Sequence, residues 1–134
     1  MLVLLDTNVV ISAILFGGVP RQILQAAVVG EIDLITSPPL LAELEGVLTR
    51  KFGFSATAAA STRAELEGIG EVVEPASVEQ VTKNSADDLV LAAAVAGEVE
   101  VTVTGDKELL AIASYEGIRI ESPGTFNEGL EKST

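Results

Sequence analysis

The chain has 134 residues, a net charge of −12 and a mean hydropathy of +0.44. This charge argues against nucleic-acid binding through a broad basic surface, and the absence of cysteine and histidine excludes a disulfide framework and the usual zinc sites. The longest uncharged stretch, residues 7–20, contains two glycines and a proline and falls short of the roughly 20 apolar residues that cross a membrane.

Short apolar runs alternate with amphipathic stretches along the whole chain. Residues 2–5 predict a strand, 8–15 and 20–29 helices, and 31–36 a second strand. A helix over 37–52 follows, in which Ser37 can cap the first turn and leucines form one stripe. The remaining predictions are a helix at 55–67, a strand at 71–75, a helix at 85–97, a strand at 99–104, a helix at 106–115, a strand at 118–121 and a helical end at 124–131.

Strands separated by helices indicate βαβ units, and therefore a single α/β domain with a largely parallel sheet covered on both faces. In such sheets, ligands bind beyond the carboxyl ends of the strands. Asp6 follows the first predicted strand, and Asp106 follows the strand at 99–104. Each could also be an ordinary helix N-cap, and local sequence does not choose between the two interpretations.

Two further acidic positions are ambiguous in the same way. Ser85 and Asp88 have the spacing of a capping box, but Asp88 also shares a helix face with apolar residues, which would point it toward the sheet. Glu43 and Glu45 flank the leucine stripe of the helix at 37–52 on opposite sides, so periodicity does not separate them.

Taken together, these acids predict a metal site. Asp6 and Asp106 end strands and Asp88 opens a helix, and all three positions lie at the same edge of a parallel sheet. Carboxylates that lie close together repel one another unless a cation lies among them. Because the chain has no histidine, the ligands would all be oxygen atoms, and Mg²⁺ or Mn²⁺ suits such a site. Such a site is suited to phosphodiester hydrolysis.

Four segments in this order and spacing resemble PIN-domain ribonucleases, and in particular the VapC-like toxins of prokaryotic toxin–antitoxin pairs. They are LLDTNVVISAIL, PPLLAELEGVLTRKF, DDLVLAAA and VTVTGDKELL, and the resemblance extends from Leu2 to Phe126. It implies a Rossmann-like three-layer α/β/α sandwich with a central parallel sheet of order 3-2-1-4-5. It also implies an Mg²⁺- or Mn²⁺-dependent endoribonuclease.

The resemblance assigns roles to individual residues. It places the catalytic and metal-binding acids on Asp6, Glu43, Asp88 and Asp106. Supporting roles fall on Asn8, which would orient Asp6, on Thr104, whose hydroxyl would lie near the metal, and on Asp87 as an accessory acid. The chain has Asn84-Ser85 where relatives often have Asp-Pro, and only Arg50, Lys51, Lys83 and Lys107 are plausible phosphate contacts.

Other functions fit the sequence less well. A phosphatase of the haloacid type needs a second aspartate where Asn8 stands, and a receiver domain needs an acidic pair after its first strand. The remaining alternative is a PIN-like binding module for RNA or protein with weak or no nuclease activity. We expect a cytoplasmic protein without a membrane segment, because the chain does not start with a signal-peptide pattern. An RNA substrate, a homodimer and a cognate antitoxin are the expected partners.

Overall fold

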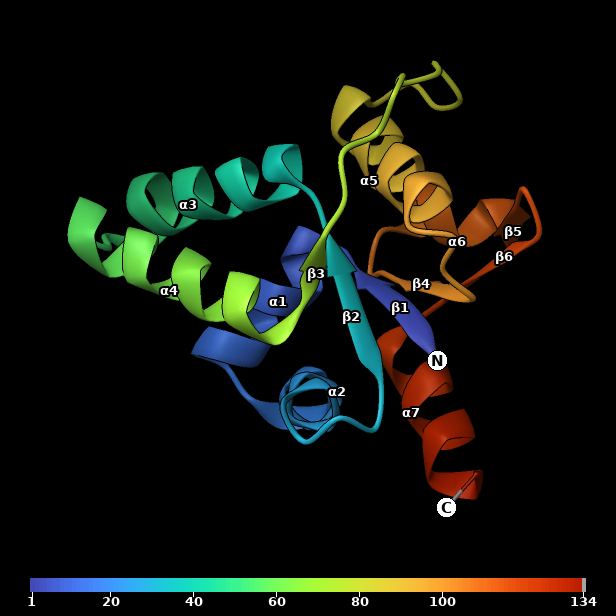
Figure 1. Ribbon diagram of the computed structural model, residues 1–134, viewed down its shortest axis with the longest axis horizontal. Coiled ribbons are helices and arrows are strands. Elements are labelled where there is room, and N and C mark those ends of the chain that lie inside the picture. Colours follow the sequence, from blue (N-terminus) through green and yellow to red (C-terminus); the bar gives the residue numbers. More distant parts are fainter. Residues whose placement is uncertain (134) are drawn as a thin grey trace.

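The centre of the protein is a six-stranded sheet in the computed structural model, which describes residues 1–133 (Figure 1). Its strands are β1 (Leu2–Leu5), β2 (Asp33–Thr36), β3 (Glu71–Val72), β4 (Val101–Val103), β5 (Ser114–Tyr115) and β6 (Ile118–Glu121). They lie in the order β3-β2-β1-β4-β6-β5. All neighbours are parallel except β5 and β6, which form an antiparallel pair at one edge.

Helices cover both faces of the sheet. They are α1 (Thr7–Leu15), α2 (Gly18–Val28), α3 (Pro38–Phe52), α4 (Ala56–Ile69), α5 (Ser85–Ala96), α6 (Lys107–Ile112) and α7 (Pro123–Lys132). Side chains alternate along a strand, so Val3 and Leu5 face α1, α2 and α7, while Leu4 faces α5 and α6. Figure 1 shows these two helical layers, with α3 and α4 packed together beside them.

The α/β/α sandwich and its mainly parallel sheet confirm the predicted fold class. The expected order 3-2-1-4-5 is also found, with β6 as the fifth parallel strand and β5 added outside it. Most predicted elements are present, but the last three residues of the helix expected over 106–115 are not helical. Ala113 adopts a φ of +65° and ends the helix at Ile112. A turn with positive φ at Glu116 and Gly117 then pairs β5 with β6.

The sheet brings the carboxyl ends of β1 and β4 together. Leu5 is in register with Val103, and the Asp6 amide donates to the Val103 carbonyl at 2.9 Å. Helices α1 and α6 begin directly after these strands, and α5 begins at the same edge (Figure 1). Three helix N-termini and two strand ends therefore surround the point where Asp6 emerges from the core.

Among residues 1–133, no single helix is both long and apolar enough to cross a bilayer. By length and composition only, the combination of α1 with α2 reaches that threshold, and the two helices meet at an angle of 100°.

Gly70 sets how closely the end of α4 approaches β2. A methyl group there would lie 2.9 Å from the Leu34 carbonyl oxygen, whereas nothing lies within 4 Å of one at Gly68. We expect Gly70→Ala to lower the free energy of unfolding by about 1–3 kcal/mol, because the backbone must shift. Gly68 lies within α4, and the control Gly68→Ala should leave the free energy of unfolding unchanged or raise it by up to ~1 kcal/mol, because alanine favours the helix. Urea unfolding compares the two, and equal stabilities would contradict the close approach.

Candidate active site

Asp6 is buried at the end of β1, with its carboxylate held by a hydroxyl from β4's end. Thr104 Oγ1 donates to Asp6 Oδ2 at 2.7 Å, and Thr104 itself is fully buried. Asp6 occupies the N-cap position of α1, but its side chain makes no cap hydrogen bond. Burial raises the pKa of Asp6, the Thr104 hydroxyl lowers it in part, and the charge of Asp106 raises it again. A helix cap alone therefore does not explain why this carboxylate is buried.

Asp106 is both a helix cap and a member of the acidic group. Its Oδ1 accepts from the amides of Glu108 at 2.8 Å and Leu109 at 3.1 Å, which caps α6. Its own amide donates to Thr104 Oγ1 at 3.0 Å. One hydroxyl thus connects the two aspartates that end β1 and β4. The resemblance had implied only that the Thr104 hydroxyl lies near the metal.

Asp87, on the first turn of α5, is the most perturbed of these acids. Its side chain is only 5% exposed, and Oδ2 has no hydrogen-bond partner among the described residues. Burial, followed by repulsion from Asp106, Asp6, Glu108 and Asp88 in that order, raises its pKa to about 6. A buried, unpartnered carboxylate oxygen in a negative environment is costly unless something binds it.

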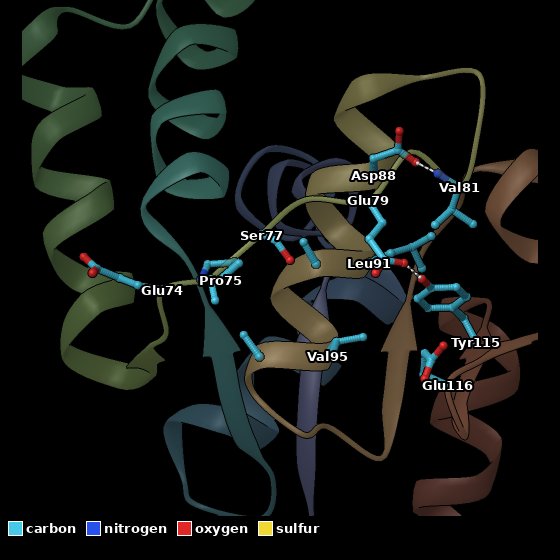
Figure 2. Close-up of a pocket in the computed structure, with 13 residues that line it drawn as sticks. Glu74, Pro75, Ser77, Glu79, Val81, Asp88, Leu91, Val95, Tyr115 and Glu116 are labelled. Carbon is cyan, nitrogen blue, oxygen red and sulfur yellow. Dashed lines mark hydrogen bonds between the residues drawn. The ribbon is translucent and has the colours of Figure 1, made fainter.

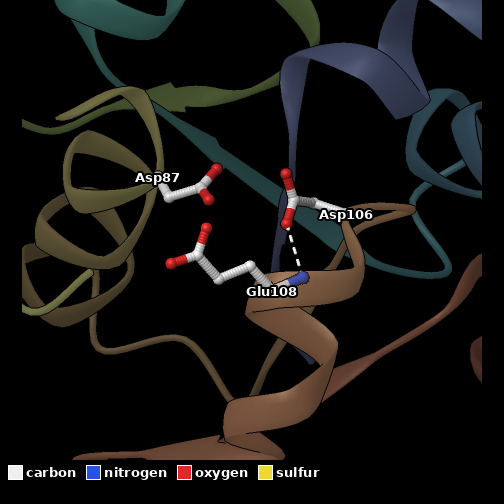
Figure 3. Close-up of side chains that lie close together, drawn as sticks. All are labelled: Asp87, Asp106 and Glu108. Atoms are coloured by element: carbon white, nitrogen blue, oxygen red, sulfur yellow. Dashed lines mark hydrogen bonds between the residues drawn. The ribbon is translucent and has the colours of Figure 1, made fainter. Parts of the chain in front are cut away.

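Glu108 completes a cluster that the sequence did not predict. Carboxylate oxygens of Asp87, Asp106 and Glu108 all lie within 4.8 Å of one another, and Figure 3 shows the three side chains converging. Glu108 also accepts from the Lys83 amide at 3.3 Å. The available signal was its place in the first turn of α6, two residues after Asp106, but acids in first turns are common for helix-dipole reasons.

Asp88 lies outside this cluster, which corrects the placement predicted from sequence. Its Oδ1 accepts from the amides of Val81 and Thr82 at 3.1 and 2.8 Å, and from the Thr82 hydroxyl at 3.0 Å. These bonds, led by that of the Thr82 amide, lower the pKa of Asp88. The alternative of a Ser85–Asp88 capping box is also not found, because Asn84 caps α5 by accepting from the Ala86 amide.

Asp87 joins the acidic cluster in place of Asp88 because of the way α5 is rotated about its axis. Asp87 shares a face with Val90, Leu91 and Ala94, all of which are buried. The face that was expected to carry Asp88 inward ends at Val95, which is 42% exposed. Asp88 instead lines a groove of about 440 Å³ between α5, the segment 74–81 and the turn at Tyr115 (Figure 2).

Glu43 is distinguished from Glu45 by its surroundings. Glu45 forms a 2.7 Å ion pair with Arg63 of α4. Glu43 instead lies near the start of α1: burial raises its pKa, a hydrogen bond from the Thr7 side chain lowers it, and the charge of Asp6 raises it. The structure thus places Glu43 beside Asp6, the relation that the sequence left open between the two glutamates.

Asn8 is exposed and acts on Asp6 only through its backbone amide, which lowers the Asp6 pKa slightly, as does the amide of Thr7. Within residues 1–133, no hydrogen bond joins the Asn8 side chain to the Asp6 carboxylate. Its side-chain oxygen lies beside Gly105, 4.0 Å from the position of a Cβ there. The structure therefore gives no support to an orienting role for this side chain.

The donors around Asp87 are all carboxylate oxygens. Hard divalent cations such as Mg²⁺ and Mn²⁺ prefer such donors, and a buried oxygen without a partner offers one ligand that is already desolvated. Because the charges repel, a cation would also relieve the repulsion that raises the pKa of Asp87. The residues present therefore fit an oxygen-ligated divalent metal.

Comparison with known proteins identifies the family and the fold of the chain. The sequence matches the family model of the PIN domain over residues 2–108, and no curated protein matches it significantly. The fold is similar to a chain in the crystal structure of VapBC2 from Rickettsia felis bound to a DNA fragment from their promoter. The TM-score is 0.64 and the sequence identity 18%, with 91% of this chain and 98% of that chain covered. At this identity the similarity concerns the fold.

The Asp87 pKa predicts how one substitution changes stability with pH. A carboxyl whose pKa rises from 3.8 to about 6 on folding destabilises the protein progressively as pH increases between these values. We therefore expect Asp87→Asn to be more stable than wild type at pH 7 by about 1–2 kcal/mol, less than the full shift implies because water and ions screen the cluster. The difference should vanish near pH 4. Urea unfolding at both pH values measures it, with exposed Glu128→Gln as a control that should differ from wild type at neither.

Proposed function

Because the chain belongs to the PIN-domain family, we propose that it is an Mg²⁺- or Mn²⁺-dependent endoribonuclease that hydrolyses phosphodiester bonds of single-stranded RNA. One observation carries the proposal: Asp87 is buried, has an unpartnered oxygen, and faces Asp106 and Glu108. A binding module has no need to keep such a carboxylate dry and surrounded by like charge. An active metal site does.

The residues divide into ligands and residues that hold them. We assign the metal to Asp6, Asp87, Asp106 and Glu108, with Glu43 beside Asp6. Asp87 thus takes the place that the sequence pattern gave to Asp88. Thr104 fixes the rotamer of Asp6, and Asp88 fastens the 81–82 segment over the start of α5. A bound Mg²⁺ or Mn²⁺ would supply the positive charge that offsets substrate repulsion and would activate water for attack on phosphorus.

A place in a toxin–antitoxin pair is part of the proposal, and is supported by the fold shared with a chain of the VapBC2 complex. A basic segment of an antitoxin could neutralise the acidic site by inserting into it, since the surrounding charge is strongly negative. The protein would act in the cytoplasm, where its RNA substrates are. A small upstream reading frame that encodes a DNA-binding N-terminus would support the pairing.

The cleavage test separates the adjacent acids of α5. Wild type should cut single-stranded RNA with Mg²⁺ or Mn²⁺ and stop in excess EDTA. We expect Asp87→Asn to lower kcat by at least about a hundredfold, because a ligand is lost. Asp88→Asn, the matched control one residue away, should lower it by less than about tenfold. A gel assay with labelled RNA measures both. Cleavage that survives EDTA, or a larger loss at Asp88 than at Asp87, would contradict the assignment.

The proposal also includes a homodimer, which can be tested directly. Several large apolar side chains are exposed, among them Phe16 at 74%, Val29 at 69% and Val28 at 60%. Burial of such residues between two copies would remove apolar surface from water. Multi-angle light scattering at tens of micromolar should give twice the 13.9 kDa chain mass. A monomer mass across that range would rule the dimer out.

A further inference from the structure

Arg50 differs from the other arginines of the chain. Within residues 1–133, Arg63 and Arg119 form ion pairs, and Arg21 donates to backbone carbonyls of α1. Arg50 is exposed and has neither a carboxylate nor a carbonyl partner in that range. An unpaired guanidinium is unusual in a chain with a net charge of −12, and its five donors remain available for a ligand.

Gly46 lets the Arg50 side chain fold back along α3. A methyl group at Gly46 would lie 2.7 Å from both Nη1 and Nη2 of Arg50. The guanidinium therefore occupies the space that a side chain at Gly46 would fill. Helical side chains lean toward the N-terminus, so this direction costs little strain. The φ of Gly46 is not positive, and the glycine is required here only for the space it leaves.

The fold-back brings the guanidinium toward the proposed active site. Glu43 and Arg50 are seven residues apart, about 20° short of two full turns, so they lie on one face of α3. Helix α3 packs against α1, whose first residue Thr7 makes a side-chain hydrogen bond to Glu43, so the face that carries Glu43 is the one that meets the site. Gly46 lies only three residues, or ~4.5 Å along the axis, beyond Glu43. The guanidinium thus lies about one helical turn along α3 from Glu43.

We infer that Arg50, folded over Gly46, binds a backbone phosphate of the RNA strand next to the phosphate that is cut. The inference rests on the proposed function for its substrate. A guanidinium binds phosphate oxygens through two parallel hydrogen bonds and keeps its charge at all physiological pH values. Arg50 would give an acidic protein a local positive contact for a polyanion, about one helical turn along α3 from Glu43.

The first test is the steady-state cleavage of single-stranded RNA with Mg²⁺ in three variants. Arg50→Ala should raise KM about tenfold and change kcat by less than about twofold, because a charged hydrogen bond to the bound strand is lost. Lys132→Ala on α7 removes the same charge far from the site and should change KM by less than twofold. The logarithmic salt dependence of RNA affinity should fall by about 0.7 in Arg50→Ala alone.

Gly46→Ala keeps the arginine but moves its guanidinium. We expect KM to rise several-fold while the melting temperature stays the same or rises, because alanine favours the helix. A general charge effect of Arg50 would leave KM of this variant unchanged. Arg50→Lys should recover only part of the affinity, since an ammonium group cannot make the paired contact.

RNA binding in the Asp87→Asn background, followed by fluorescence anisotropy with Mg²⁺, separates this inference from the nuclease proposal. If wild type cuts no RNA but binding still depends on Arg50 and not on Lys132, the nuclease proposal fails and the phosphate contact stands. If wild type cuts RNA but Arg50→Ala and Lys132→Ala are equal in KM and salt dependence, the phosphate contact is overturned. It is also overturned if Arg50→Ala weakens binding to an acidic protein partner while RNA binding is unchanged.

Discussion

The rest of the site depends on the two hydrogen bonds of the Thr104 hydroxyl. The hydroxyl donates to Asp6 and accepts from the amide of Asp106, and so joins residues that end two neighbouring strands. Both bonds require β1 and β4 to be parallel and in register, with Leu5 beside Val103. Because Thr104 is fully buried, its hydroxyl has no competing water, and the position of the Asp6 carboxylate follows from the sheet itself.

The sheet edge gathers negative charge under conditions that disfavour it. Burial raises the pKa values of Asp6, Glu43 and Asp87, and the acids repel one another. The N-termini of α1, α5 and α6 oppose this in part, since their dipoles favour negative charge. A fold selected for stability alone would pair or expose these carboxylates, as Glu45 is paired with Arg63. Their burial without cations is the feature that relates this architecture to metal chemistry.

The few positively charged side chains differ in whether they are paired with acids. Arg63 and Arg119 form ion pairs, whereas Arg50 has no acidic partner within residues 1–133 and folds back over Gly46. An acidic protein can act on a polyanion only if its attraction is local, because its overall field is repulsive. In this chain, such attraction can arise at the acidic cluster, if it binds the proposed metal, and at the face of α3 that carries Glu43 and Arg50.

The sequence by itself determined the fold class and the edge of the sheet where acids meet. Both follow from alternating strand and helix patterns, which depend on neighbours along the chain, whereas the order of the parallel strands was implied by the resemblance to PIN-domain ribonucleases. The sequence could not determine which of two adjacent acids on α5 faces that edge, because every residue from Leu89 to Ala96 is apolar and gives the helix no phase. Packing of Val90, Leu91 and Ala94 against the sheet decided it, and turned Asp87 inward and Asp88 toward the 81–82 segment. In the same way, the ion pair of Glu45 with Arg63, 18 residues away on α4, and the position of Glu43 near Asp6 separated the two glutamates. Both choices depend on how a helix rotates against a distant partner, and that rotation exists only in the tertiary structure.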